Sequence, residues 1–108
     1  MDTMDESAFD KAARDELHAI EDALAEIDPD NVEISTSDGI LRLDCRDGTK
    51  VVINSHRAAR QIWMAAVSTA WHFDPAGDGR WVAPKSGDEL RATVTRLLSE
   101  HGGVTVRL

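Results

Sequence analysis

The chain has 108 residues, of which 42% are apolar and 30% are charged, and its formal net charge at pH 7 is −8. This composition is typical of one globular domain over residues 1–108 and argues against a disordered chain. The longest apolar run has six residues, too short to span a membrane, and a single cysteine excludes an internal disulfide. We therefore expect a cytoplasmic protein that binds neither nucleic acid nor membranes.

The negative charge is concentrated at one end of the chain. Residues 1–33 contain twelve of the twenty acidic residues but only two basic ones, Lys11 and Arg14. Twelve negative and two positive charges give this segment −10, and since the whole chain carries −8, the remaining residues sum to +2. Such one-sided acidity attracts cations and basic protein surfaces.

A first amphipathic helix is predicted from about Ala8 to the residue before Pro29. Either Ser7 or Asp5 can cap its beginning, and Pro29 ends it because the residue before a proline is biased out of helical geometry. Apolar residues recur every three or four positions along one stripe. These are Phe9, Ala13, Leu17, Ile20, Leu24 and Ile27.

The pattern then changes to alternating apolar and polar residues, which is typical of strands with one covered face. Turn signals at Asp38-Gly39 and Asp47-Gly48 separate the first strands. A basic link over residues 56–60 is expected to join the third strand to the fourth. About six short strands are predicted, over residues 32–35, 41–46, 50–54, 61–65, 70–74 and 80–83.

A second helix is predicted from Asp88 to the glycine pair Gly102-Gly103, followed by an extended tail over residues 104–108. The order of a helix, a run of strands and a helix indicates an α+β fold. We expect two helices packed on one face of an antiparallel sheet, with the other face turned to water.

Acidic side chains on and after the first helix form a candidate cation-binding surface. On a helical wheel Asp15, Asp22 and Glu26 lie within about 40° of one another, opposite the apolar stripe. Carboxylate oxygens suit iron and other hard divalent or trivalent cations, and their exposure predicts weak, salt-sensitive binding. The candidate ligands are Asp15, Asp22, Glu26, Asp28, Asp30, Glu33 and His18.

The alternative for these residues is an ordinary solvated helix face. In that case Lys11 forms a surface ion pair with Asp15, four residues further on, and His18 donates a hydrogen bond to a carboxylate.

Alternation also predicts which side chains lie on the open face of the sheet. Among them, Trp63 is the most informative, because a large aromatic side chain on a solvated face is typical of an anchor for a protein partner. The alternative is that it covers its cross-strand neighbours. Trp71 and Phe73 have the opposite parity and are expected in the core, and Trp81 fits either place. The open-face set is Asn54, Gln61, Trp63, Ala65 and His72.

Taken together, these segments resemble the frataxin family over essentially the whole chain, from about Ser7 to Arg107. The resemblance rests on Lys50-Val51-Val52-Ile53-Asn54 followed by Gln61-Ile62-Trp63, on His72-Phe73-Asp74 with Trp81 after it, and on the acidic first helix. It implies the frataxin fold, weak iron binding and a role in iron–sulfur cluster biogenesis. It further implies contact with a cysteine desulfurase and its scaffold protein.

The leading hypothesis is therefore a non-catalytic, iron-responsive regulator and adaptor of cluster assembly. It places the desulfurase against Asp22, Glu26 and Asp30. Contact with the scaffold side is expected at Asn54, Gln61, Trp63 and His72. A monomer is expected, in which metal can induce oligomers.

Two alternatives stay open. One is a weak ferroxidase or an iron store that uses the same carboxylates. The other is an acidic protein-binding module that has no relation to iron.

Overall fold

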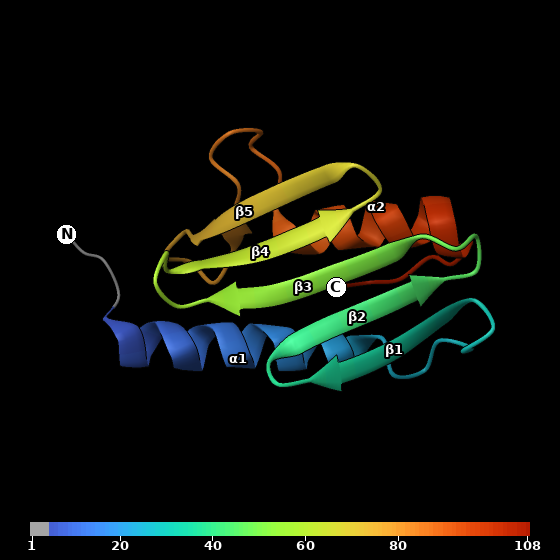
Figure 1. Cartoon of the computed structure of the whole chain (residues 1–108), viewed down its shortest axis with the longest axis horizontal. Coiled ribbons are helices and arrows are strands. Elements are labelled where there is room, and N and C mark those ends of the chain that lie inside the picture. The colour runs from blue at the N-terminus through green and yellow to red at the C-terminus, as the bar shows by residue number, and fades with distance from the viewer. Residues whose placement is uncertain (1–4) are drawn as a thin grey trace.

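A computed structural model, which describes residues 5–108, shows one sheet with two helices behind it (Figure 1). The acidic residue Asp2, counted above, lies outside the described residues. The helices α1 (Glu6–Ala23) and α2 (Leu90–Gly102) lie on the same face of the sheet. The expected α+β arrangement is confirmed. The strands are β1 (Val32–Ser37), β2 (Ile40–Cys45), β3 (Lys50–His56), β4 (Gln61–Ala66), β5 (Thr69–Pro75) and β6 (Trp81–Val82).

Every strand pairs antiparallel with the next one along the chain, so the order in the sheet is β1-β2-β3-β4-β5-β6. Alternate side chains of β2 to β5 point toward the helices and are buried there, as the period-2 pattern predicts. Trp71, Phe73 and Trp81 all lie in the core, and the Trp81 ring packs edge-on against Phe9 with centroids 5.9 Å apart. Among the described residues, none of the helices combines the length and apolar character needed to cross a bilayer.

α1 begins after Asp5, whose carboxylate accepts a hydrogen bond from the N–H of Ala8 at 2.8 Å. Of the two predicted caps, Asp5 is the one used, and Ser7 lies in the first turn. α1 ends at Ala23, well before Pro29, so the predicted end is wrong. After Ala23 the chain tightens into turns, in which the N–H groups of Ala25 and Ile27 bond to carbonyls three residues earlier. As a consequence Glu26 lies outside the helix, and its predicted place on the helical wheel does not apply.

α2 begins at Leu90, two residues later than predicted. The carboxylate of Glu89 accepts hydrogen bonds from two N–H groups of the first turn and caps the helix. Asp88, the predicted first residue, accepts a hydrogen bond from the indole N–H of Trp71 at 3.0 Å. The predicted stop is confirmed: Gly103 adopts the left-handed conformation, with φ of 68°, that glycine tolerates best.

A partly buried ion pair connects the two helices. Arg91 of α2 donates two hydrogen bonds to the carboxylate of Glu16 on α1, from Nε at 2.9 Å and from Nη2 at 2.8 Å. The hydrogen bonds to Glu16 raise the pKa of Arg91 above its ordinary value, against the opposing effect of burial. The pattern of apolar and charged residues did not predict this pair. The available signal is the place of Glu16 within the apolar stripe, three residues after Ala13 and four before Ile20.

Five strands differ in length from the prediction: β1, β3 and β5 are each two residues longer, β4 is one residue longer and β6 is two residues shorter. β3 continues to His56, which therefore belongs to the sheet and not to the basic link. β6 has only two residues, because the chain leaves the sheet after Val82.

Candidate functional site

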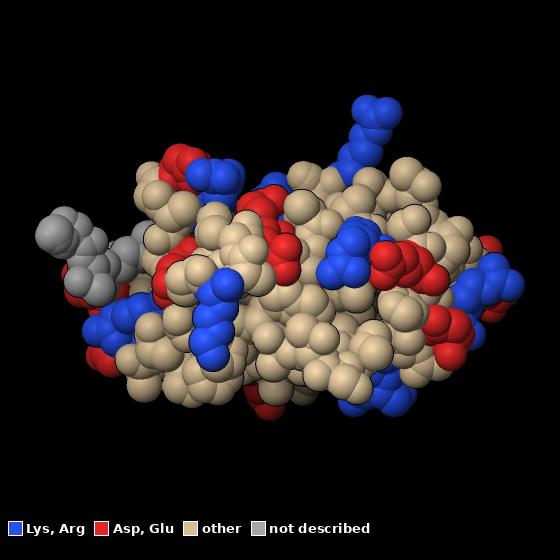
Figure 2. Space-filling model, turned by 90° about the horizontal axis from the view of Figure 1, so that it is seen from above, with Lys and Arg blue, Asp and Glu red and all other residues tan. Residues whose placement is uncertain are grey.

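The predicted acidic surface follows the chain from α1 through the loop into β1. We call it the acidic ridge and define it by Asp15, Asp22, Glu26, Asp28, Asp30 and Glu33. All six residues are exposed. Residues 15–41 contain nine acidic residues and no lysine or arginine. By contrast, the side of the molecule shown in Figure 2 has basic and acidic side chains interspersed.

Within the acidic ridge, one carboxylate already has a partner. Lys11 donates a hydrogen bond to Asp15 at 2.6 Å, so the predicted surface pair is confirmed. This bond, together with the nearby positive charges of Lys11 and Arg14, lowers the pKa of Asp15. The ring of His18 is exposed, and it forms no hydrogen bond with any residue in the range 5–108. The predicted bond from His18 to a carboxylate is therefore absent.

The geometry of the ridge limits how it can hold a metal ion. Over the described residues, no group of three or more histidine, cysteine, aspartate or glutamate side chains could surround one ion. Asp28 accepts a hydrogen bond from the N–H of Asp30 at 2.9 Å, a local turn that orients the loop before β1. Exposed carboxylates arranged in this way can make one or two direct bonds to a cation, and water supplies the other ligands.

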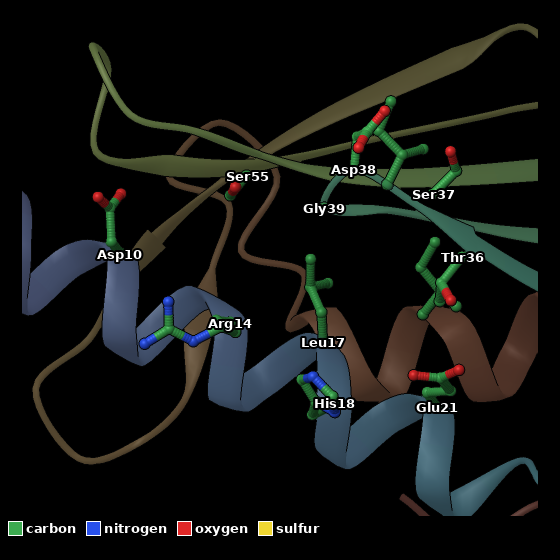
Figure 3. Close-up of a pocket in the computed structure, with 12 residues that line it drawn as sticks. Asp10, Arg14, Leu17, His18, Glu21, Thr36, Ser37, Asp38, Gly39 and Ser55 are labelled. Atoms are coloured by element: carbon green, nitrogen blue, oxygen red, sulfur yellow. The ribbon is translucent and has the colours of Figure 1, made fainter.

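A cavity of about 440 Å³ lies between α1 and the turn that joins β1 to β2 (Figure 3). In Figure 3, Leu17 points from α1 toward the turn, and Arg14 and His18 lie on the same helix next to it. Glu21 and Thr36 line the other end of the cavity. The size is that of a small-molecule site, but the lining mixes acidic, basic and apolar groups. No pattern in the sequence predicted this cavity.

On the open face of the sheet, Trp63 lies between two histidines. Its ring centroid is 3.9 Å from that of His56 and 4.2 Å from that of His72, and the planes differ by only 14° and 12°. The indole N–H donates to the side-chain oxygen of Gln61 at 2.9 Å, and the amide of Gln61 donates to Asp74 at 2.9 Å. The indole is therefore half-buried and held in one orientation.

The structure brings the predicted open-face residues together. Asn54 is the cross-strand neighbour of Trp63 on β3, and His72 is its neighbour on β5. The alternative that Trp63 covers its cross-strand neighbours is supported by the stacking on His72, and the role of Trp63 as an anchor for a partner stays a prediction. The second stacking partner, His56, was missed because β3 is longer than its sequence pattern indicates.

Comparison with known proteins decides the family. The frataxin-like domain model matches residues 2–104. The chain belongs to the frataxin-like family. The iron-sulfur cluster assembly protein CyaY of Ralstonia pickettii is 36% identical over 112 residues, covering 100% of this chain and 97% of that protein. Its counterpart in Ralstonia nicotianae is 37% identical over the same length, with 100% and 97% covered.

Solved structures agree with this frataxin-like assignment. Frataxin from Psychromonas ingrahamii superimposes with a TM-score of 0.86 at 26% identity, covering 95% of this chain and 96% of that one. The trimeric frataxin of the yeast Saccharomyces cerevisiae, complexed with ferrous iron, gives a TM-score of 0.68 at 26% identity, with 96% and 91% covered. The fold and family expected from the sequence are confirmed.

Proposed function

We propose that this chain is a non-catalytic, iron-responsive adaptor of iron–sulfur cluster assembly. In this proposal the acidic ridge binds a basic surface of the cysteine desulfurase, and the open face around Trp63 contacts the scaffold protein. The observation that carries it is the pairing of two distinct exposed surfaces on one frataxin-like domain. Its curated relatives are named iron-sulfur cluster assembly proteins.

The charge of the acidic ridge supports a basic protein partner. The side chains of Asp22, Glu26 and Glu33 have no ion-pair partner among residues 5–108, so their negative charge is available to another molecule. Charges of this kind raise association rates and select partners of opposite sign, and salt weakens both effects.

The open face supports a second protein contact. A tryptophan held between two histidines and hydrogen-bonded through Gln61 offers a rigid aromatic surface that loses little conformational freedom on binding. Gln61 is itself fixed by Asp74. Such a preorganised patch suits a partner better than a mobile side chain does.

Iron enters this proposal as cargo or signal. The exposed carboxylates of the ridge supply hard oxygen atoms, but without a closed cage the ion keeps most of its water. We therefore expect weak binding in which other hard cations substitute for iron. A yeast relative has been crystallised with ferrous iron, which supports this part of the proposal. A weak ferroxidase or an iron store that uses the same carboxylates stays the alternative to this proposal.

The test is charge reversal on the ridge, two residues at a time, among Asp22, Glu26 and Asp30. Calorimetry against purified cysteine desulfurase should show binding weakened at least about tenfold by Asp22→Lys/Glu26→Lys. The matched control is Asp78→Lys/Glu100→Lys, which changes the net charge by the same amount away from the ridge. Unchanged affinity in the ridge variant, or an equal loss in the control, would contradict the proposal.

The iron part is tested separately by NMR. Anaerobic addition of Fe²⁺ should broaden or shift the backbone signals of Asp22, Glu26 and Asp30 before those of Asp78 and Glu100. If no ridge signal responds at millimolar metal, the chain is an acidic binding module without a role for iron.

A further inference from the structure

β1 forms an open edge of the sheet. In the order β1 to β6 it has a neighbour on one side only. Its six residues make it much longer than β6, the other edge, which has two. The side chains of Ser35, Thr36 and Ser37 are exposed, so nothing in the described residues covers this half of the strand. Soluble proteins usually protect such an edge with lysine, proline or a bulge, and β1 contains neither lysine nor proline.

The hydrogen-bond pattern identifies the backbone groups that face outward. The N–H of Arg46 donates to the carbonyl of Asn31 at 2.9 Å, and these two residues continue the register of β1 with β2. Bonded and non-bonded pairs alternate along an antiparallel ladder. Ser35 therefore bonds to β2, whereas Ile34 and Thr36 direct their N–H and C=O groups away from the sheet.

A neighbouring residue confirms this alternation. The N–H of Val32, two residues before Ile34, donates to the carbonyl of Asp28 at 3.2 Å and not to β2. Within residues 5–108, the N–H groups of Ile34 and Thr36 have no hydrogen-bond partner. Two adjacent outward sites are thus left for a strand from another molecule.

The charge around β1 selects the kind of strand. Glu33 lies on β1, and Asp30 and Asp38 flank it, all three exposed. With nine acidic residues and no lysine or arginine over residues 15–41, this edge repels a second copy of the chain. It attracts an extended segment that carries lysine or arginine.

We propose that β1 is a docking edge, on which an extended basic segment of a protein partner pairs as an additional strand. The backbone of that segment bonds to Ile34 and Thr36, and its basic side chains face Glu33 and the rest of the acidic ridge. On the face of the sheet that the helices cover, a basic side chain of the partner's segment next to Thr36 lies close to Glu21, at the end of the cavity in Figure 3. The inference rests on the proposed function only in taking the cysteine desulfurase as the partner.

The test uses a proline that removes one outward donor and leaves the sheet intact. Thr36→Pro deletes the outward N–H and places a ring on the edge, but breaks no bond to β2 because the N–H of Thr36 makes none. Thr36→Val is the matched control, with a similar shape and the N–H retained. In calorimetry with purified cysteine desulfurase, Thr36→Pro should bind about tenfold more weakly than Thr36→Val.

Hydrogen exchange on the native chain gives a second measurement that does not depend on the proline variant folding. In the desulfurase complex, the amides of Ile34 and Thr36 should exchange at least about tenfold more slowly, with no change at Ser35. Equal affinities of Thr36→Pro and Thr36→Val, or unprotected amides at Ile34 and Thr36, would overturn strand addition.

The outcomes separate the two proposals. If the native chain does not bind the desulfurase, the proposed function fails. If reversal at Asp22 and Glu26 abolishes binding whereas Thr36→Pro does not, only strand addition fails. A native dimer that Thr36→Pro converts to a monomer in sedimentation would show that the occupant is a second copy, which also overturns this inference.

Discussion

Replacing Arg91 with methionine should destabilise the protein more than replacing its partner Glu16 with methionine. The side chain of Glu16 is only 6% exposed, whereas that of Arg91 is 37% exposed. Loss of Arg91 leaves a carboxylate that is shut away from water and has lost both of its hydrogen bonds. Loss of Glu16 leaves a guanidinium group that can turn toward solvent. The two halves of one ion pair therefore differ in what their removal costs.

The expected magnitudes follow from this difference in exposure. Breaking a buried ion pair by removing one partner costs about 3–5 kcal/mol. Because Arg91 is partly exposed, we expect a loss of about 3 kcal/mol in unfolding free energy for Arg91→Met and about 1.5 kcal/mol for Glu16→Met. The double variant should cost less than the sum, with a coupling of about 1–3 kcal/mol, because it leaves no charge unpaired.

Urea unfolding at pH 7, followed by circular dichroism and tryptophan fluorescence, measures these costs. The matched control lies on the same helix: Arg96 and Glu100 form a pair at 3.2 Å whose side chains are 51% and 52% exposed. Arg96→Met and Glu100→Met should each cost no more than about 0.5 kcal/mol. Equal losses for Arg91→Met and Glu16→Met, or a strictly additive double variant, would refute this reasoning.

Three further changes test other features. Lys11→Met removes the ion-pair partner of Asp15. The freed carboxylate should strengthen cation binding at the acidic ridge about two- to threefold in an NMR titration. Hydrogen bonds from the N–H of Thr49, and to a smaller extent with the ring of His101, lower the pKa of Asp47 from 3.8 to about 2. The contribution of Asp47 to stability is therefore present above pH 3.8 and is lost as the pH falls through about 2. Asp47→Asn should flatten that part of the pH dependence of unfolding. Val67, with φ of 59° and 70% exposure, is a strained β-branched residue, and Val67→Asn should stabilise the protein by about 1 kcal/mol in urea unfolding.

Each of these three predictions has a matched control variant or an outcome that would contradict it. As the control for Lys11→Met, Lys85→Met removes an exposed lysine away from the acidic ridge and should leave cation binding nearly unchanged. An acid unfolding curve that Asp47→Asn does not alter would show that the hydrogen bonds of Asp47 contribute nothing to stability. Val67→Thr keeps the branched side chain, so an equal gain for Thr and Asn would mean that strain is not the cause.

The regular elements could be predicted from the sequence because burial imposes a period on them. The stripe of α1 and the alternation in β2 to β5 come directly from that constraint. The helix ends could not, since they depend on single hydrogen bonds that leave no periodic signal. Glu89 caps α2, although the neighbouring Asp88 looks equally suitable from the sequence. The turns after Ala23 end α1 before Pro29 can do so.

For the candidate site, parity alone was enough to place Asn54, Trp63 and His72 on one face. The stacking of His56 escaped prediction because its strand continues through residues that read as a basic link. The ion pair between Glu16 and Arg91 escaped because no local pattern connects two helices at opposite ends of the chain. Such contacts are decided by how the layers pack.

That same ion pair joins residues 75 positions apart, one on α1 and the other on α2. At roughly 5–20 residues per second, a ribosome needs about 4–15 s to make the intervening chain. During that interval the apolar stripe of α1 has no complete sheet or second helix to cover it. Translation products that stop before α2 would keep this surface uncovered, which makes them natural targets for chaperones and proteases.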